Sequence, residues 1–221
     1  MKLFISAISK FIIGFILLAL MLFLPAGTFL YTGAWIFLSV LFVPMLILGI
    51  LLFFKSPKLL EKRLNSKEKE AAQKGVVALS ALMFPLGFVL SALDFRFGWS
   101  DVPLWLVILS SILFLFGYAM YAEVMRENAY LSRTIRVEEN HKLVSCGLYG
   151  IVRHPMYLAT LFMFLPIPLI LGSFYGLIPF ILYPVIIVLR IIGEEKLLTH
   201  KLKGYAEYKE KVKYRLIPFI F

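Results

Sequence analysis

A short polar segment in the C-terminal half of the chain combines residue types that can hold an anion. Arg153 and His154 stand directly before Pro155 in the sequence Arg-His-Pro-Met-Tyr, and an apolar run follows. Proline suits the first turn of a helix, where its missing N–H is no loss, so the pattern predicts a helix that begins at Pro155. The N–H groups of such a helix start could bind an anionic ligand group. Arg153 and His154 could equally be anchors at a membrane boundary, as basic residues often are.

A second polar group follows the last apolar run of the sequence. Arg190 and Glu194 are four residues apart, which places them on one face of a helix, and Glu195 is adjacent. Charges so close to an apolar run are costly and tend to be functional, although a structural ion pair at the water interface would give the same pattern. Two adjacent carboxylates beside a binding site would favour a cation or a primary ammonium group.

The composition indicates that these groups belong to a membrane protein. Of 221 residues, 61% are hydrophobic and 16% are charged, against about 45–50% and about 25% in soluble domains. The excess is too large for a buried core, so apolar surface must face lipid. The net charge of +10 fits basic residues near lipid headgroups better than nucleic-acid binding, because no basic domain stands apart from the apolar runs.

Cysteine and histidine usage gives no sign of a metal site. The single cysteine, Cys146, excludes an internal disulfide and is expected to be a small apolar filler. His141, His154 and His200 lack ligand spacing and thiolate partners, so no metal is expected.

Apolar runs predict an all-α, polytopic integral membrane protein with about six transmembrane helices. The runs cover residues 11–24, 34–54, 76–93, 103–122, 156–171 and 174–189. A span needs about 20 apolar residues, which the second to fourth runs reach and the first reaches with its flanks. The last two runs are short and contain several prolines, so kinks are expected. They could be two tilted spans, which we favour, or five spans plus a hairpin.

The charges predict the orientation and the organisation of the chain. Of the 23 basic residues, 22 lie near the N-terminus, in the linker 55–75, after the fourth run or in the tail. The positive-inside rule therefore predicts cytoplasmic termini, in a plasma, inner or endoplasmic reticulum membrane according to the host. Residues 1–122 are expected to hold four spans, with 55–75 as an amphipathic connector on the membrane surface. Residues 123–221 are expected to form the functional region.

Five pieces of the sequence, in their order, resemble the isoprenylcysteine carboxyl methyltransferase family, which is related to membrane phospholipid methyltransferases. The pieces are His-Lys-Leu-Val-Ser-Cys-Gly-Leu-Tyr at 141–149, Arg-His-Pro-Met-Tyr at 153–157, Glu-Glu at 194–195, Gly-Tyr-Ala-Glu-Tyr at 204–208 and Arg-Leu-Ile-Pro at 215–218. The resemblance covers about residues 128–218, with a looser likeness in the N-terminal spans. Each piece is short, and the specificity comes from the ordered set.

The resemblance implies a methyltransferase that uses S-adenosyl-L-methionine, whose sulfonium and amino groups suit a carboxylate pair. The acceptor would be lipophilic, either a prenylcysteine-like carboxylate or a lipid headgroup. Arg190 and Glu194 match positions that bind this acceptor. Tyr205 and Tyr208 would either close over the pocket or pack against other side chains. The residues implied to hold the cofactor are His141, Lys142, Leu143, Val144, Tyr149, Arg153, His154, Pro155, Met156, Tyr157 and Glu195. The stretch from Glu195 to Tyr205 is about one residue shorter than the family pattern.

Methyl transfer from a sulfonium is an in-line displacement whose thioether leaves without a proton. The protein therefore mainly aligns the reactants and excludes water. A carboxylate acceptor would need no base, and Arg190 could orient it by a bidentate contact. An amine or hydroxyl acceptor could pass its proton to Glu194. The sequence leaves both possibilities open.

Two other functions fit parts of the sequence. A membrane sterol-type reductase that uses NADPH also carries an Arg-His-Pro-x-Tyr element, but the His-Lys-Leu-Val stretch, the glutamate pair and the short chain favour a methyltransferase. A transporter or scaffold would place polar groups near the bilayer midplane, whereas these cluster at one end of the spans. A Rossmann-type cofactor fold is not expected, because no G-x-G-x-x-G turn follows a strand.

Overall fold

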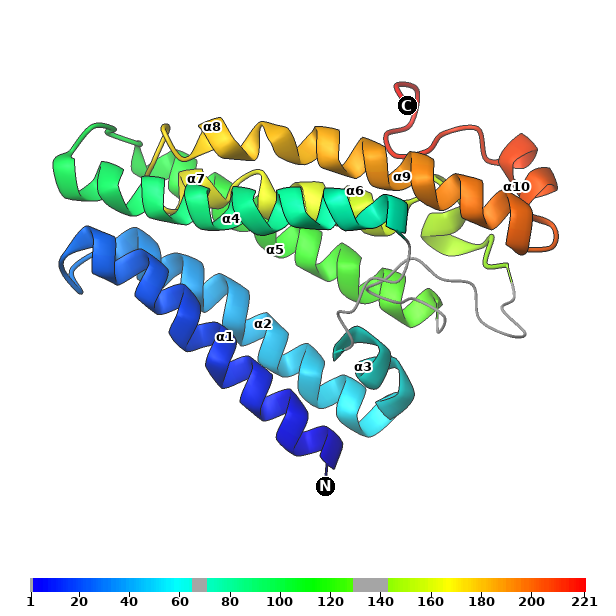
Figure 1. Cartoon of the computed structure of the whole chain (residues 1–221), viewed down its shortest axis with the longest axis horizontal. Helices are drawn as coiled ribbons and strands as arrows, with labels where there is room; N and C mark the ends of the chain where they lie inside the picture. The colour runs from blue at the N-terminus through cyan, green and yellow to red at the C-terminus, as the bar shows by residue number, and fades with distance from the viewer. Residues whose placement is uncertain (1, 65–70, 129–142) are drawn as a thin grey trace.

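The computed structural model describes residues 2–64, 71–128 and 143–221, and all regular elements in these ranges are helical, as predicted (Figure 1). A short 3₁₀ turn covers Gly147–Gly150. The α-helices are α1 (Lys2–Ala26), α2 (Thr32–Lys55), α3 (Pro57–Leu64), α4 (Ala71–Phe97), α5 (Leu104–Glu127), α6 (Pro155–Phe164), α7 (Ile167–Ile170), α8 (Leu177–Phe180), α9 (Leu182–Lys201) and α10 (Tyr205–Lys211).

Long apolar helices make this chain an integral membrane protein. Within the described ranges, five segments are long and apolar enough to cross a bilayer: Leu3–Ala26, Thr32–Lys55, Gly75–Phe97, Leu104–Glu127 and Leu177–Lys201. At most 28% of each apolar window is buried inside the protein. Most of the apolar surface therefore faces outward, where only lipid can cover it.

The fifth predicted span is shorter than the others, which corrects our preference for six full spans. Residues Pro155–Ile170 form α6 and α7, separated at Leu165 and Pro166. At a rise of about 1.5 Å per residue they extend about 24 Å, less than the hydrocarbon thickness of about 30 Å. In Figure 1 they run back along α5, and α8 and α9 then return, so this region forms a hairpin packed on the bundle.

The first two helices pack as a pair against the later ones. Phe37 of α2 is fully buried, with ring centroids 5.7 Å from Phe88 of α4 and 6.1 Å from Phe114 of α5. Helices α5 and α6 are in close contact at Gly117, where an added Cβ would lie 2.8 Å from the Ala159 carbonyl oxygen. Small residues allow such close helix contacts in membranes.

A buried polar network closes one end of the bundle, which we call the Asp94 end. Asp94 accepts hydrogen bonds from the Ser100 N–H and hydroxyl, both at 2.7 Å, and from the Ser173 hydroxyl. The Tyr31 hydroxyl donates to the Leu171 carbonyl at 2.7 Å. These bonds join the start of α2, the end of α4 and the turn between α7 and α8.

The opposite end, where α5 and α9 finish, is called the Glu194 end. Lys10, near the start of α1, donates to the Leu64 carbonyl of α3 at 2.6 Å, and the tail returns to α9 through Arg215. Both the start of α1 and the tail therefore lie on the Glu194 side. Arg96 lies at the Asp94 end, beside the carbonyl of Pro25.

Candidate functional site

Helix α6 begins at Pro155, as predicted, but the tail of the chain occupies the backbone just before it. The N–H of Arg153 donates to the Tyr214 carbonyl and the N–H of His154 to the Arg215 carbonyl, both at 2.9 Å. Pro155 has no N–H. The N–H groups of Arg153 and His154 are therefore not free for an anion, so any anion contact at this helix start would have to come from other groups.

Glu195 is buried between two arginines. Its Oε1 lies 2.7 Å from Arg153 Nε and its Oε2 lies 2.9 Å from Arg215 Nε, and 6% of its side chain is exposed. Arg153 also donates to the carbonyls of Val212 and Lys213, at 2.8 and 3.0 Å. A buried carboxylate needs such charged partners. Glu195 thus binds the tail to the start of α6.

The neighbouring Glu194 has different surroundings. It accepts a hydrogen bond of 2.7 Å from the Tyr157 hydroxyl, and His154 Nδ1 lies 3.9 Å from the same oxygen. Arg190 Nε lies 3.5 Å from the Tyr157 hydroxyl. The Glu194 side chain is 27% exposed, against 6% for Glu195. The structure therefore brings Arg190, Glu194, Tyr157 and His154 together, and leaves Glu194 the more accessible of the two carboxylates.

Two buried polar atoms of this cluster have no hydrogen-bond partner within the described part of the chain: His154 Nε2 and the Tyr205 hydroxyl. His154 Nε2 lies 3.5 Å from Glu195 Oε1, without the alignment of a hydrogen bond. Burial, and then the charges of Glu195 and Glu194, raise the pKa of Tyr205, which keeps its hydroxyl protonated and able to donate. Buried polar atoms without partners are uncommon, so a ligand contact is expected at these two positions.

The turn Gly147–Gly150 presents Tyr149 to the same cluster. Asn128 Nδ2 donates to the Tyr149 hydroxyl at 3.0 Å, and the Tyr208 hydroxyl donates to the Tyr149 carbonyl at 2.7 Å. Burial is the main cause that raises the pKa of both tyrosines. Tyr149 and Tyr208 therefore remain neutral hydrogen-bonding groups.

A carboxylate at the end of α5 fixes the entry into this turn. Glu127 accepts the N–H of Leu148 at 3.1 and 3.2 Å through its two oxygens. Gly147 has a φ of +59°, and a Cβ at this position would collide with the Glu127 carboxylate. The turn therefore requires glycine at position 147.

The other predicted cofactor residues lie around this cluster. Leu143 packs against the small apolar cluster that contains Tyr205 and Tyr208, so these tyrosines are packed as well as close to the site. Val144 is half-buried and Pro155 is buried, while Met156 points its sulfur toward Arg63. His141 and Lys142 lie outside the described residues.

Two residues considered in the sequence analysis lie away from the site. His200 is exposed at the end of α9. Cys146 is exposed as well, which corrects the expectation that it fills a gap between apolar side chains.

Sequence reasoning missed Arg63 and Arg215. Arg63 belongs to α3, whose buried Leu59 and Leu60 hold it against the bundle, and it donates to the Tyr121 hydroxyl. The amphipathic pattern of the connector predicts a helix packed on the bundle, but it does not predict that Arg63 contacts Tyr121. Arg215 opens the Arg-Leu-Ile-Pro piece of the family resemblance, but that piece gave it no role, and its contact with Glu195 appears only in the structure.

Together, the fold and the site define a polytopic all-α membrane protein with a cluster of carboxylates, arginines and tyrosines at one end of its bundle. Residues 105–205 match a family described as phospholipid methyltransferase. The matched segment runs from α5 to the start of α10 and is similar to this family of integral-membrane methyltransferases, which are related to the isoprenylcysteine carboxyl methyltransferases. No curated protein matches the chain. The match supports a membrane methyltransferase over the reductase and the transporter.

Proposed function

We propose that this protein uses S-adenosyl-L-methionine to methylate a lipophilic acceptor at the cytoplasmic face of its membrane. The family match supports the methyl transfer. The observation that carries the proposal further is the meeting of three segments around Glu194: residues 147–157, residues 190–195 and the tail after Tyr205. This cluster holds two buried polar atoms, on His154 and Tyr205, that lack partners among the described residues.

The residues present fit S-adenosylmethionine. Its cationic groups suit a site beside Glu194, whose carboxylate is partly exposed. His154 Nε2 and the Tyr205 hydroxyl are available to its polar atoms. Tyr149 is held near Glu194 by Asn128 and Tyr208. When bound, the cofactor supplies an activated methyl group on its sulfur.

The side chains next to Glu194 would then position the acceptor. The Tyr157 hydroxyl fixes the Glu194 carboxylate by its hydrogen bond of 2.7 Å. Arg190, on the same helical face, would orient an acceptor carboxylate. Glu194 would instead accept the proton of an amine or hydroxyl acceptor. The buried tyrosines of α10 would exclude water from the reacting atoms.

Methyl transfer and cofactor binding test the proposal separately. In membranes incubated with labelled S-adenosylmethionine, we expect Glu194→Ala and His154→Ala each to abolish labelling of the lipid fraction while the protein remains folded in detergent. His200→Ala, at an exposed position on the same helix as Glu194, is the matched control and should retain activity. If calorimetry on the purified wild-type protein detects no binding of S-adenosylhomocysteine, the proposal fails.

A further inference from the structure

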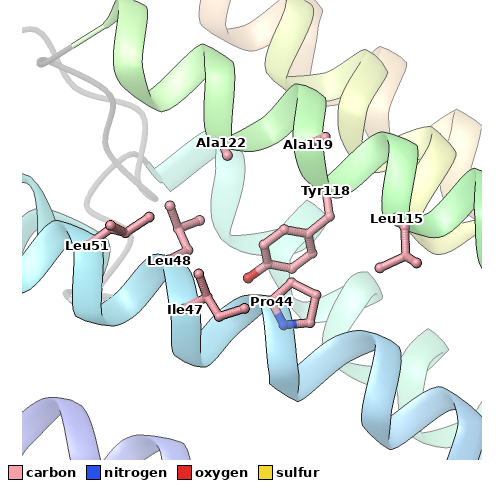
Figure 2. A pocket seen from close by; sticks show the side chains of 8 residues that line it. All are labelled: Pro44, Ile47, Leu48, Leu51, Leu115, Tyr118, Ala119 and Ala122. Carbon is pink, nitrogen blue, oxygen red and sulfur yellow. The ribbon is translucent and has the colours of Figure 1, made fainter.

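An apolar groove lies between α2 and α5 (Figure 2). Its volume is about 240 Å³. The lining residues are Pro44, Ile47, Leu48 and Leu51 of α2 and Leu115, Tyr118, Ala119 and Ala122 of α5. Both sets have the spacing i, i+3, i+4, i+7, so the two helices face each other over about 10 Å.

The walls of the groove fit a hydrocarbon chain. Tyr118 is the one lining residue with a polar side chain, and its hydroxyl points toward α2 in Figure 2. The small side chains of Ala119 and Ala122 leave the space open. Water would find almost no hydrogen-bond partners here, whereas a lipid chain would make apolar contacts along both helices.

A guanidinium lies next to one end of this groove. Tyr121 neighbours Ala122 in sequence, and its ring centroid is 6.1 Å from that of Tyr118. Arg63 of α3 lies 5.2 Å from the centroid of the Tyr121 ring and donates to its hydroxyl. Within the part of the chain that the structure describes, no carboxylate pairs with Arg63. A half-buried guanidinium with a phenol as its partner favours an anionic ligand group.

The same arginine adjoins the Glu194 cluster. Arg63 Nη1 lies 4.0 Å from the sulfur of Met156, the residue before Tyr157. Tyr157 in turn holds Glu194. A series of side-chain contacts therefore links the groove, through Arg63, to the candidate site, and a chain lying in the groove with its polar end toward Arg63 would bring that end close to the site.

We infer that the groove between α2 and α5 holds the hydrocarbon chain of the methyl acceptor, and that Arg63 selects acceptors with an anionic group beside this chain. The inference rests on the proposed function and names its substrate class, an anionic amphiphile taken from the bilayer. It also gives the N-terminal half of the chain a role in choosing the acceptor, although the family match begins only at residue 105.

Binding of two simple probes to the purified full chain tests this inference. The probes are radiolabelled oleate and the uncharged oleyl alcohol, measured by equilibrium binding in detergent. Ala119→Phe, which fills the groove, should weaken both probes by at least about tenfold. Arg63→Gln should weaken oleate by at least about tenfold and leave oleyl alcohol unchanged, because only oleate loses a charge-assisted hydrogen bond. Ala122→Phe is a second groove variant, in case Ala119→Phe does not fold.

The matched control is Ala81→Phe, the same substitution at an exposed position of α4, and it should bind both probes like the wild type. Wild-type binding of oleate by folded groove variants, or equal effects of Arg63→Gln on both probes, would overturn the inference. Binding of S-adenosylhomocysteine, measured in parallel, should be unchanged in every variant. If the wild type does not bind S-adenosylhomocysteine, the proposed methyl transfer is refuted. If the variants bind S-adenosylhomocysteine normally and also bind both probes like the wild type, only the role of the groove is refuted.

Discussion

The two adjacent glutamates provide the sharpest test of the site, because the same substitution should affect stability at one position and activity at the other. Glu195→Gln removes the charge between Arg153 and Arg215, and one amide oxygen cannot replace two carboxylate oxygens. Glu194→Gln keeps an oxygen that can accept the Tyr157 hydroxyl. We therefore expect the first variant to lose stability and the second to lose activity.

The magnitude follows from the burial of the partners. Removing one partner of a buried ion pair costs roughly 3–5 kcal/mol. Arg153 is 6% exposed, but Arg215 is 37% exposed and can be hydrated, so the lower limit of about 3 kcal/mol applies. For a chain of this length, 1 kcal/mol shifts Tm by roughly 2–4 °C. Glu195→Gln should therefore lower Tm by roughly 6–12 °C.

Glu194→Gln should change stability by less than about 1 kcal/mol, because its hydrogen bond persists and part of its surface already faces solvent. Its activity should fall to background, since the amide can neither attract a cation nor accept a proton. Thermal unfolding in detergent, followed by tryptophan fluorescence, gives the stability of both variants. Transfer of labelled methyl groups to membrane lipids, measured well below both Tm values, gives the activity.

The reverse result would refute the reasoning. If Glu195→Gln unfolds like the wild type, the buried pair with Arg153 does not hold the tail against α6. If Glu194→Gln retains full activity, this carboxylate has no part in the reaction. Arg215→Gln serves as an internal check, because it removes only the more exposed partner and should lower Tm by less than Glu195→Gln does.

Two glycine pairs provide further tests. Gly147→Ala introduces a Cβ at a positive φ against the carboxylate that fixes the turn, so we expect about tenfold weaker binding of S-adenosylhomocysteine by calorimetry; Gly150→Ala, whose Cβ would meet its nearest atom at 3.5 Å, should bind normally. Gly117→Ala forces α5 away from the Ala159 carbonyl and should destabilise the protein by about 1–3 kcal/mol. Gly49→Ala meets nothing within 4 Å and should leave thermal stability unchanged or slightly higher; equal Tm values for these two variants would contradict the close packing of α5 on α6.

Most of the fold was predictable because lipid imposes a simple rule on length and polarity. The first four apolar runs, the first of them counted with its flanks, correspond to α1, α2, α4 and α5. The fifth was misjudged, since apolar composition does not show where a helix is interrupted. Pro166 separates α6 from α7, and Pro168 lies one residue into α7. How such prolines break a helix depends on the neighbouring helices that accommodate them.

The candidate site was predictable where its residues are close in sequence or share a helix. Arg190 and Glu194 are both placed next to Tyr157, as the four-residue spacing suggested for one helical face. The pairing of the tail with Arg153 and His154 could not be predicted, because the partners are about 60 residues away and their carbonyls carry no sequence signal. For the same reason the occupation of the Arg153 and His154 N–H groups by the tail could not be predicted.

The polar network at the Asp94 end has a consequence for the position of α2. The buried hydroxyl of Tyr31, at the start of α2, donates to the Leu171 carbonyl beyond α7, whereas the groove between α2 and α5 is lined mainly by apolar side chains. Apolar contacts in a bilayer can be exchanged for contacts with lipid at little cost, but buried hydrogen bonds cannot. We therefore expect α2 to keep its position at the Asp94 end, while its distance from α5 beside the groove can differ between bound amphiphiles of different width. Most of the remaining helix contacts would be unaffected by such a change.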